Sequence, residues 1–308
     1  MENQKIAVLI PCFNEEETIF EVVQNIKAQL PFASIYVYDN NSTDRSVELA
    51  KQAGAIVRFE KQQGKGNVVR TMFREILADV YLLMDADNQQ DAKDAPLLID
   101  AVLNHHADMA IGDRLSTSYF EKNPRAFHNA GNRLVRLLIN RLFNNSIRDI
   151  MTGYRAFSRR FVENFPALSP GFEIETEMTI DALDKNFNIV ELPVVFRNRP
   201  QGNVSKLNTL RDGFKVLKTI LVLFKNYKPL RFFGFWAVFF CVLALILGVP
   251  VLEEYFLTGL APRLPRLIAA GVLVMMALLC ICAGIILDVI LHLHRQDFEM
   301  RLRQKNRI

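Results

Sequence analysis

Cysteine is scarce in this sequence, and its placement excludes several classes of site. The 308 residues include only four cysteines, and none forms a C-x-x-C pair. Three of them lie inside long apolar runs towards the C-terminus: Cys241, Cys280 and Cys282. The pattern therefore indicates no disulfide framework, cysteine-based zinc site or thioredoxin-like redox motif.

The N-terminal pattern predicts no secretory leader, and the chain shows no DNA-binding motif. The apolar core of MENQKIAVLIPC is too short for a signal peptide and runs directly into a strand pattern. Positive charge is concentrated late in the chain, where residues 206–308 hold 14 Lys and Arg against 6 Asp and Glu. Because long apolar runs lie beside these charges, we interpret the basic part as facing a membrane and expect no nucleic-acid partner.

Two uncharged apolar runs predict a membrane hairpin. They cover residues 232–252 and 267–287. A helix of either length would be about 31 Å long, enough to cross a hydrocarbon core of ~30 Å. The alternative is a pair of buried core helices, but two such runs so close together fit a hairpin better. Lys and Arg flank both outer ends of the hairpin, so the positive-inside rule predicts cytoplasmic termini and an external loop.

The region before the hairpin predicts an amphipathic helix on the membrane surface. Apolar residues recur there at helical spacing, with lysines on another face: Leu210, Phe214, Leu217, Leu221 and Phe224. An ordinary surface helix packed on a soluble domain is the alternative. The expected organisation is a cytoplasmic domain (1–205), a juxtamembrane region (206–231), a transmembrane hairpin (232–294) and a basic cytoplasmic tail (295–308).

Residues 1–200 alternate strand and helix patterns. Short apolar runs predict strands over residues 5–10, 34–39, 55–60, 79–85 and 107–112. Asn14 is expected to cap the first helix, Ser42 or Thr43 to cap the second, and Gly54 to end the second. This alternation predicts an α/β domain whose mostly parallel sheet is covered by helices on both faces.

Polar side chains gather where four of the five predicted strands end. They are Asn14 and Glu15, then Asp39, then Asp85 and Asp87, then Gly112, Asp113 and Arg114. In such sheets ligands bind outside the carboxyl ends of the strands. Asp85, Asp87 and the Gln89 amide offer hard oxygen ligands that suit Mg²⁺ or Mn²⁺, although a lone D-x-D is also typical of a solvated turn.

Eight ordered blocks resemble family 2 glycosyltransferases of the GT-A fold. They are IPCFNEE (10–16), DNNSTD (39–44), QGKG (63–66), DADNQQD (85–91), GDR (112–114), DIMTGYRAF (149–157), GFEIETEM (171–178) and RPQGNVSKL (199–207). Within that family the chain is similar to dolichyl-phosphate mannose synthases and polyprenyl-phosphate hexosyltransferases. The resemblance implies inverting, metal-dependent transfer of a hexosyl group from a nucleotide-diphosphate sugar to undecaprenyl or dolichyl phosphate at the cytoplasmic membrane face.

The resemblance also implies roles for individual residues. Pro11, Asn14, Glu15, Asp39, Lys65, Asp85 and Arg114 would contact the nucleotide sugar, and Asp85, Asp87 and Gln89 would hold Mg²⁺ or Mn²⁺. The acceptor phosphate would meet Arg133, Arg199, Ser205 and Lys206. The candidate catalytic residues are Asp87, Asp149, Arg199 and Lys206. Departures from the family pattern at Phe13, Asn40 and Asp113 leave the base and the sugar open: UDP-glucose, GDP-mannose and UDP-linked amino sugars all fit.

Several local roles have alternatives. Asp149 either orients the acceptor or completes its deprotonation, or it caps a local turn. A strong base is less necessary here because a phosphate monoester, with a second pKa of ~6, is already largely ionised at neutral pH. Lys65 with its flanking glycines could form a phosphate cradle or a flexible turn. Glu177 could hold an arginine or lie on a solvated face, and Arg136 and Arg141 could face the acceptor phosphate or solvent.

Two other functions fit the sequence less well. A processive polysaccharide synthase would carry a Q-x-x-R-W motif, but the only tryptophan, Trp236, lies inside the first apolar run. A non-catalytic sugar-nucleotide sensor is disfavoured because Asp85, Asp87, Arg199 and Lys206 are all retained. Assembly into a homo-oligomer is left open by the sequence.

Overall fold

A computed structural model describes residues 4–116, 136–197, 221–222, 224–260 and 263–305. The chain divides into two compact units, residues 1–219 and 220–308. Arg133, Arg199, Ser205 and Lys206 lie outside the described residues, as does most of the predicted amphipathic segment. The roles expected of them therefore remain predictions.

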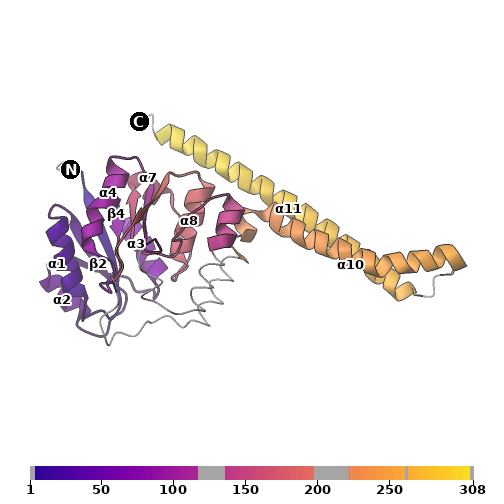
Figure 1. Cartoon of the computed structure of the whole chain (residues 1–308), viewed down its shortest axis with the longest axis horizontal. Helices are drawn as coiled ribbons and strands as arrows, with labels where there is room; N and C mark the ends of the chain where they lie inside the picture. Colours follow the sequence, from indigo (N-terminus) through magenta and orange to yellow (C-terminus); the bar gives the residue numbers. More distant parts are fainter. Residues whose placement is uncertain (1–3, 117–135, 198–220, 223, 261–262, 306–308) are drawn as a thin grey trace. The chain divides into compact units, whose positions relative to one another are not determined.

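A sheet forms the centre of the first unit (Figure 1). It has seven strands, in the order β3-β2-β1-β4-β6-β5-β7. Five strands lie where the sequence predicts them: β1 (Ile6–Cys12), β2 (Ser34–Asp39), β3 (Ile56–Phe59), β4 (Val80–Leu83) and β5 (Met109–Asp113). Two more were not predicted: β6 (Arg155–Ser158) and β7 (Ile189–Pro193). Only β6 runs antiparallel to its neighbours, so the prediction of an α/β domain with a mostly parallel sheet is confirmed.

Helices cover both faces of the sheet. On one face lie α1 (Ile19–Gln29), α2 (Ser46–Gln52) and α4 (Ala95–Leu103), whose apolar residues share one core cluster with Val8, Ile10 and Leu82. On the other lie α3 (Lys65–Glu75), α7 (Arg159–Asn164) and α8 (Ile174–Asp184). There the Phe73 ring packs edge-on against the rings of Tyr81 and Phe157. Successive side chains on a strand point to opposite faces of the sheet, so Leu82 faces the first group of helices and Tyr81 faces the second.

The predicted helix caps are wrong, although the predicted end of α2 is right. The α1 helix begins at Ile19, and Asn14 instead adopts a left-handed conformation with φ of 52°. The α2 helix begins at Ser46, whose backbone N–H is held by the Asp44 carboxylate at 2.9 Å. Gly54 follows the last turn of α2 with φ of 85°, a conformation that glycine adopts without strain.

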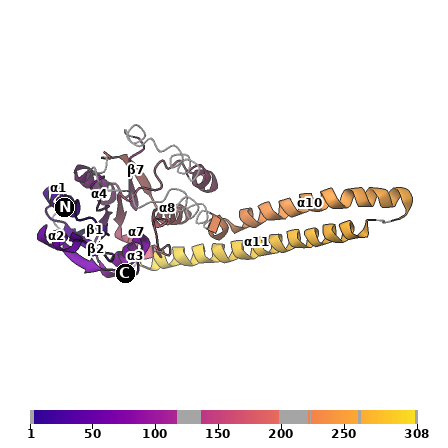
Figure 2. The ribbon, with the colours of Figure 1, turned by 90° about the horizontal axis from the view of Figure 1, so that it is seen from below.

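Two long helices form the second unit. They are α10 (Pro229–Thr258) and α11 (Leu264–Lys305), which contain both predicted spans and lie side by side in opposite directions (Figure 2). Small residues line their contact, including Ala237 and Ala244 on α10 and Ala270 and Ala277 on α11. Both helices are long and apolar enough to cross a membrane. Within this chain most of their apolar surface is exposed, whereas a core helix of a soluble protein is mostly buried.

Candidate active site

The parallel strands bring the predicted polar residues to one edge of the sheet. Cys12 at the end of β1 is in register with Asp39 at the end of β2. Just beyond them, the backbone N–H of Asn14 donates to Ser42 Oγ at 2.9 Å. Asn14 Oδ1 accepts the backbone N–H of Thr43 at 2.8 Å. The turns after β1 and β2 thus form one hydrogen-bonded wall.

Asp39 and Asn40 organise this wall. Asp39 is buried, and its carboxylate accepts the backbone N–H of Ser42 at 3.2 Å. The Asn40 amide donates to the carbonyls of Glu60 and Gln62, both at 2.9 Å, and accepts the N–H of Gly64 at 2.7 Å. Asn40, one of the departures from the family pattern, therefore fixes the loop that leads into α3.

The acidic turn follows β4 directly. Asp85 and Asp87 lie beyond Leu83, the last residue of that strand. Gln90 holds Asp85 twice: its Oε1 accepts the Asp85 N–H at 3.0 Å, and its Nε2 donates to Asp85 Oδ2 at 2.8 Å. Asp87 Oδ1 accepts the backbone N–H of Gln89 at 3.2 Å. Sequence reasoning missed Gln90, because its role depends on the turn folding back on itself.

Lys65 lies between two carboxylates. Its Nζ is 2.5 Å from Asp85 Oδ1 and 2.7 Å from Glu175 Oε1, and only 9% of its side chain is exposed. Burial opposes the charged form of Lys65, but the two carboxylates outweigh it and raise the pKa of the ammonium group. The sequence singled out Lys65 but not Glu175, its second partner.

The glycines beside Lys65 allow a close chain contact. A Cβ on Gly66 would lie 1.9 Å from the Ser169 carbonyl oxygen, and one on Gly64 would lie 2.3 Å from that of Pro170. The backbone N–H of Gly66 donates to the Pro170 oxygen at 3.0 Å. The backbone N–H groups of Gly64 and Gly66 are thus bonded within the chain, to Asn40 and Pro170, and the role of this loop towards a phosphate stays a prediction.

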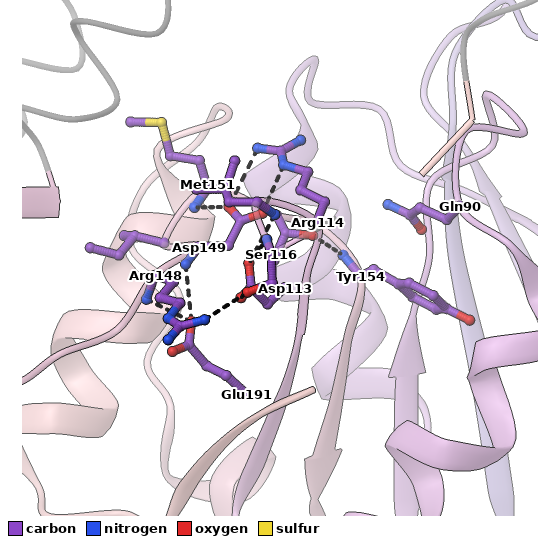
Figure 3. Close-up of polar contacts among 12 residues, drawn as sticks. Gln90, Asp113, Arg114, Ser116, Arg148, Asp149, Met151, Tyr154 and Glu191 are labelled. Carbon is purple, nitrogen blue, oxygen red and sulfur yellow. Dashed lines mark hydrogen bonds and ion pairs between the residues drawn. The ribbon is translucent and has the colours of Figure 1, made fainter. Parts of the chain in front are cut away.

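Arg114 and Asp149 form a second ion pair. Arg114 Nε lies 2.8 Å from Asp149 Oδ2, and the two side chains point towards one another in Figure 3. Asp149 Oδ1 also accepts the backbone N–H of Met151 at 3.3 Å, so Asp149 caps a local turn as well. A shallow pocket beside the pair is lined by Leu115, Arg136, Arg148, Asp149, Ile150 and Met151.

Two further carboxylates hold the chain around this pair. Glu191 Oε1 accepts the backbone N–H groups of Arg148 and Asp149 at 2.8 and 3.0 Å (Figure 3). Asp113 Oδ1 accepts the N–H of Leu115 at 2.9 Å, and its other oxygen accepts from the Ser116 hydroxyl, which Arg148 contacts at 2.9 Å. Asp113, another departure from the family pattern, therefore shapes the turn after β5.

Arg155 supports the loop that carries Asp149. It is fully buried and donates to the carbonyls of Ile150 and Thr152 at 2.6 and 2.9 Å and to Thr179 Oγ1 at 2.8 Å. Burial lowers the pKa of Arg155 to about 10, so the guanidinium stays charged at neutral pH. A lone arginine inside the short apolar run YRAF was the signal available in the sequence.

Glu177 has neither of the roles expected for it. It is buried, and its carboxylate accepts the backbone N–H groups of Leu168 and Ser169 at 3.0 and 2.7 Å. These bonds hold the loop that reaches Gly64 and Gly66. A solvated face was the wrong expectation because α8 is buried continuously from Ile174 to Ala182.

The acidic turn fits a divalent ion completed by phosphate oxygens. Among the described residues, no three His, Cys, Asp or Glu side chains cluster into a ready-made metal site. Mg²⁺ is usually bound by one or two carboxylates together with substrate phosphates. A carboxylate has about four lone-pair positions, so the hydrogen bonds to Asp85 and Asp87 leave room for an ion.

Comparison with known proteins identifies the family of this chain. The family model described as Glycosyl transferase family 2 matches residues 7–165. Glycosyltransferase AglJ of Haloferax volcanii is 31% identical over 299 residues, covering 96% of each chain. The dolichol-phosphate mannosyltransferase of Pyrococcus furiosus is 31% identical over 231 residues, covering 72% of this chain and 64% of that protein.

Solved structures show the same fold. A crystal structure of Mycobacterium tuberculosis glucosyl-3-phosphoglycerate synthase has a TM-score of 0.58 at 21% identity, covering 72% of this chain and 81% of that chain. Another structure of that enzyme, with a TM-score of 0.58 at 22% identity and covering 72% and 80% of the two chains, contains Mn²⁺, UDP and glucosyl-3-phosphoglycerate. The matched family model and the full-length likeness to AglJ show that this chain belongs to glycosyl transferase family 2 and is a glycosyltransferase.

Proposed function

We propose that the protein transfers a hexosyl group from a nucleotide-diphosphate sugar to polyprenyl phosphate, with inversion at the anomeric carbon. The observation that carries the proposal is a glycosyltransferase sheet edge with an acidic turn, on a chain that also has two helices apolar enough to cross a membrane. Relatives named dolichol-phosphate mannosyltransferase and polyprenol monophosphomannose synthase support a lipid-phosphate acceptor.

The donor would lie along the ends of β1, β2 and β4. Pro11, Asn14 and Glu15 would border the nucleotide, and Asp39 would bind the base. Asp85, Asp87 and Gln89 would hold Mg²⁺ or Mn²⁺ beside the diphosphate. A bound ion there would neutralise the charge that develops on the leaving diphosphate.

The acceptor would approach from the end of β5 and the start of β6, which meet at the same edge of the sheet. An acceptor phosphate oxygen attacks the anomeric carbon while the bond from that carbon to the diphosphate oxygen breaks. Arg114, which lies 2.8 Å from Asp149, would contact the acceptor phosphate from this side. Arg133, Arg199, Ser205 and Lys206 would complete the phosphate contacts, and Lys206 and Arg199 would also stabilise the leaving group.

The membrane arrangement follows from the hairpin. We infer that α10 and α11 cross the membrane and that the catalytic unit and both termini are cytoplasmic, because Lys and Arg flank the outer ends of the two spans. This arrangement would place the catalytic unit on the side of the membrane that holds nucleotide sugars.

Radiolabel transfer tests the proposal. The purified full-length protein is incubated with polyprenyl phosphate, Mg²⁺ or Mn²⁺, and labelled UDP-glucose, GDP-mannose or UDP-N-acetylglucosamine in turn. Label is expected in the lipid extract for one donor, and a chelator is expected to abolish it. Nucleotide binding with no transfer from any donor would instead indicate a sensor, and transfer unaffected by the chelator would contradict the metal assignment.

A further inference from the structure

A cation from another segment, Lys65 at the start of α3, lies against the acidic turn after β4. Lys65 Nζ contacts Asp85 Oδ1 at 2.5 Å and Glu175 Oε1 at 2.7 Å, and the Phe172 ring lies over it with its centroid 5.9 Å away. Gln90 takes the other oxygen of Asp85 at 2.8 Å. The orientation of Asp85 is therefore decided by protein donors before any ligand binds.

Four segments of the chain meet around the Lys65 ammonium group, and glycines allow their close approach. Gly64 and Gly66 let the loop at Ser169 and Pro170 approach α3, which brings the start of α8, and with it Glu175, to Lys65. From the side of β6, a Cβ on Gly153 would lie 2.6 Å from Asp85 Oδ2 and 2.7 Å from Lys65 Nζ. A side chain at position 153 would therefore push against both partners of the Lys65–Asp85 pair.

We propose that Lys65 and Glu175 are positioning residues for Asp85: the ammonium group orients the Asp85 carboxylate, and Glu175 balances its charge so that the turn stays negative enough to hold a divalent ion. This inference rests on the proposed function, because it concerns the same ion and diphosphate. Neither residue needs to touch the substrate. Their effect passes through Asp85.

The charges predict opposite effects on ion binding. Asp85, Asp87 and Glu175 are negative and Lys65 is positive. Glu175→Gln removes one negative charge, so Mn²⁺ should bind roughly tenfold more weakly. Lys65→Met removes the positive charge, so Mn²⁺ should bind roughly tenfold more tightly. Both variants should lose turnover by at least about tenfold, because Asp85 is no longer held in place.

The double variant Lys65→Met/Glu175→Gln separates orientation from charge. It restores the net charge of the turn and leaves no uncompensated buried carboxylate, so it should fold even where Lys65→Met alone does not. Its Mn²⁺ affinity is expected within about threefold of wild type, while its turnover stays low. A role limited to stability would instead restore turnover together with folding.

Asp181→Asn is the matched control. Asp181 lies on α8, as Glu175 does, and is also a buried carboxylate bonded to a lysine, with Lys185 Nζ at 3.0 Å. It is six positions after Glu175, which places it ~9 Å further along the helix. Its removal should change Mn²⁺ affinity by less than about twofold.

The experiment is a Mn²⁺ titration followed by electron paramagnetic resonance, with the full-length protein and UDP or GDP present, alongside turnover with the active donor. Opposite shifts in Mn²⁺ affinity for Glu175→Gln and Lys65→Met, with low turnover in both, are the expected result. Unchanged affinity, or shifts of the same sign, would overturn the inference and leave the proposed function standing. If the wild type bound no Mn²⁺ with either nucleotide, the proposed ion site would fail, and this inference with it.

Discussion

Arg114 Nε and Asp149 Oδ2 lie 2.8 Å apart, although 35 positions separate the two residues in the sequence. Asp149 is only 2% exposed, so the guanidinium is the counter-charge that makes this buried carboxylate tolerable. The same contact holds the Arg114 side chain just after the end of β5, at the edge of the sheet where the acceptor is proposed to bind. The ion pair therefore compensates the buried Asp149 carboxylate and also holds the Arg114 guanidinium near the proposed acceptor site.

Asp149→Asn should lower turnover by about 10–100-fold across about pH 6–8, because Arg114 loses its counter-charge and any proton acceptance by Asp149 is removed. Steady-state transfer at several pH values checks this. Arg114→Met combined with Asp149→Asn should cost less than the sum of the single effects, because the two residues act as a pair. Near-normal turnover of Asp149→Asn over the whole range would exclude a role in deprotonation.

Gly153→Ala should reduce turnover by about tenfold or more while changing the melting temperature little. Its Cβ would lie 2.6 Å from Asp85 Oδ2 and 2.7 Å from Lys65 Nζ, so these flexible ends must move apart. Turnover and a thermal unfolding scan on the same preparation measure both effects. Gly271→Ala is the control, since its Cβ would meet nothing within 4 Å and its activity should be unchanged.

Arg155→Met should destabilise the protein by about 3 kcal/mol or more, because it leaves the buried carbonyl oxygens of Ile150 and Thr152 without their donor. The expected signature is a lower melting temperature together with lost activity. The neighbouring Arg159 is exposed and pairs only with Glu163 on its own helix. Arg159→Met should therefore melt close to wild type, and equal losses in the two variants would contradict the assignment.

The buried carboxyl group of Asp181 should make the free energy of unfolding depend on pH. Burial raises the pKa of its carboxyl to about 6, partly offset by Lys185. Because the folded-state pKa is raised, the stability that Asp181 contributes is complete below about pH 4 and is lost as the pH rises through about 6. The loss amounts to about 3 kcal/mol at most.

Asp181→Asn should flatten this part of the stability profile. Unfolding midpoints measured between about pH 4 and 7 are compared for the two proteins. The wild type should lose more stability than the variant as the pH rises. Parallel profiles would show that Asp181 titrates alike in the folded and unfolded chain.

The fold class was predictable because its signals are local. Apolar runs with turn residues between them located the first five strands, and the ends of those strands located Asp39, Asp85 and Arg114. The strand β6 was not predicted, because it begins with the charged Arg155 and ends with Ser158, so it shows no apolar run. Its place between β4 and β5 is a matter of long-range pairing, which local pattern does not encode.

The predicted starts of the first two helices were wrong for a related reason. Asn14 and Ser42 are residue types that cap helices, yet here they bond across to each other's turn, with the Asn14 N–H on Ser42 Oγ at 2.9 Å. Such side chains can satisfy backbone groups in turns as readily as at helix ends. Which backbone group they meet depends on the neighbouring turn, and this neighbour comes from another part of the chain.

The sequence by itself determined the kinds of element, the polar residues at the strand ends and the two long apolar helices, because periodicity and local propensity specify these. Only the tertiary structure decided the partner of each charge. Lys65 meets Asp85 and Glu175 because Gly64 and Gly66 allow a distant loop to approach to van der Waals contact, and Arg114 meets Asp149 because Glu191 and Arg155 hold the intervening chain. These pairings depend on distances between segments far apart in sequence, and packing alone fixes such distances.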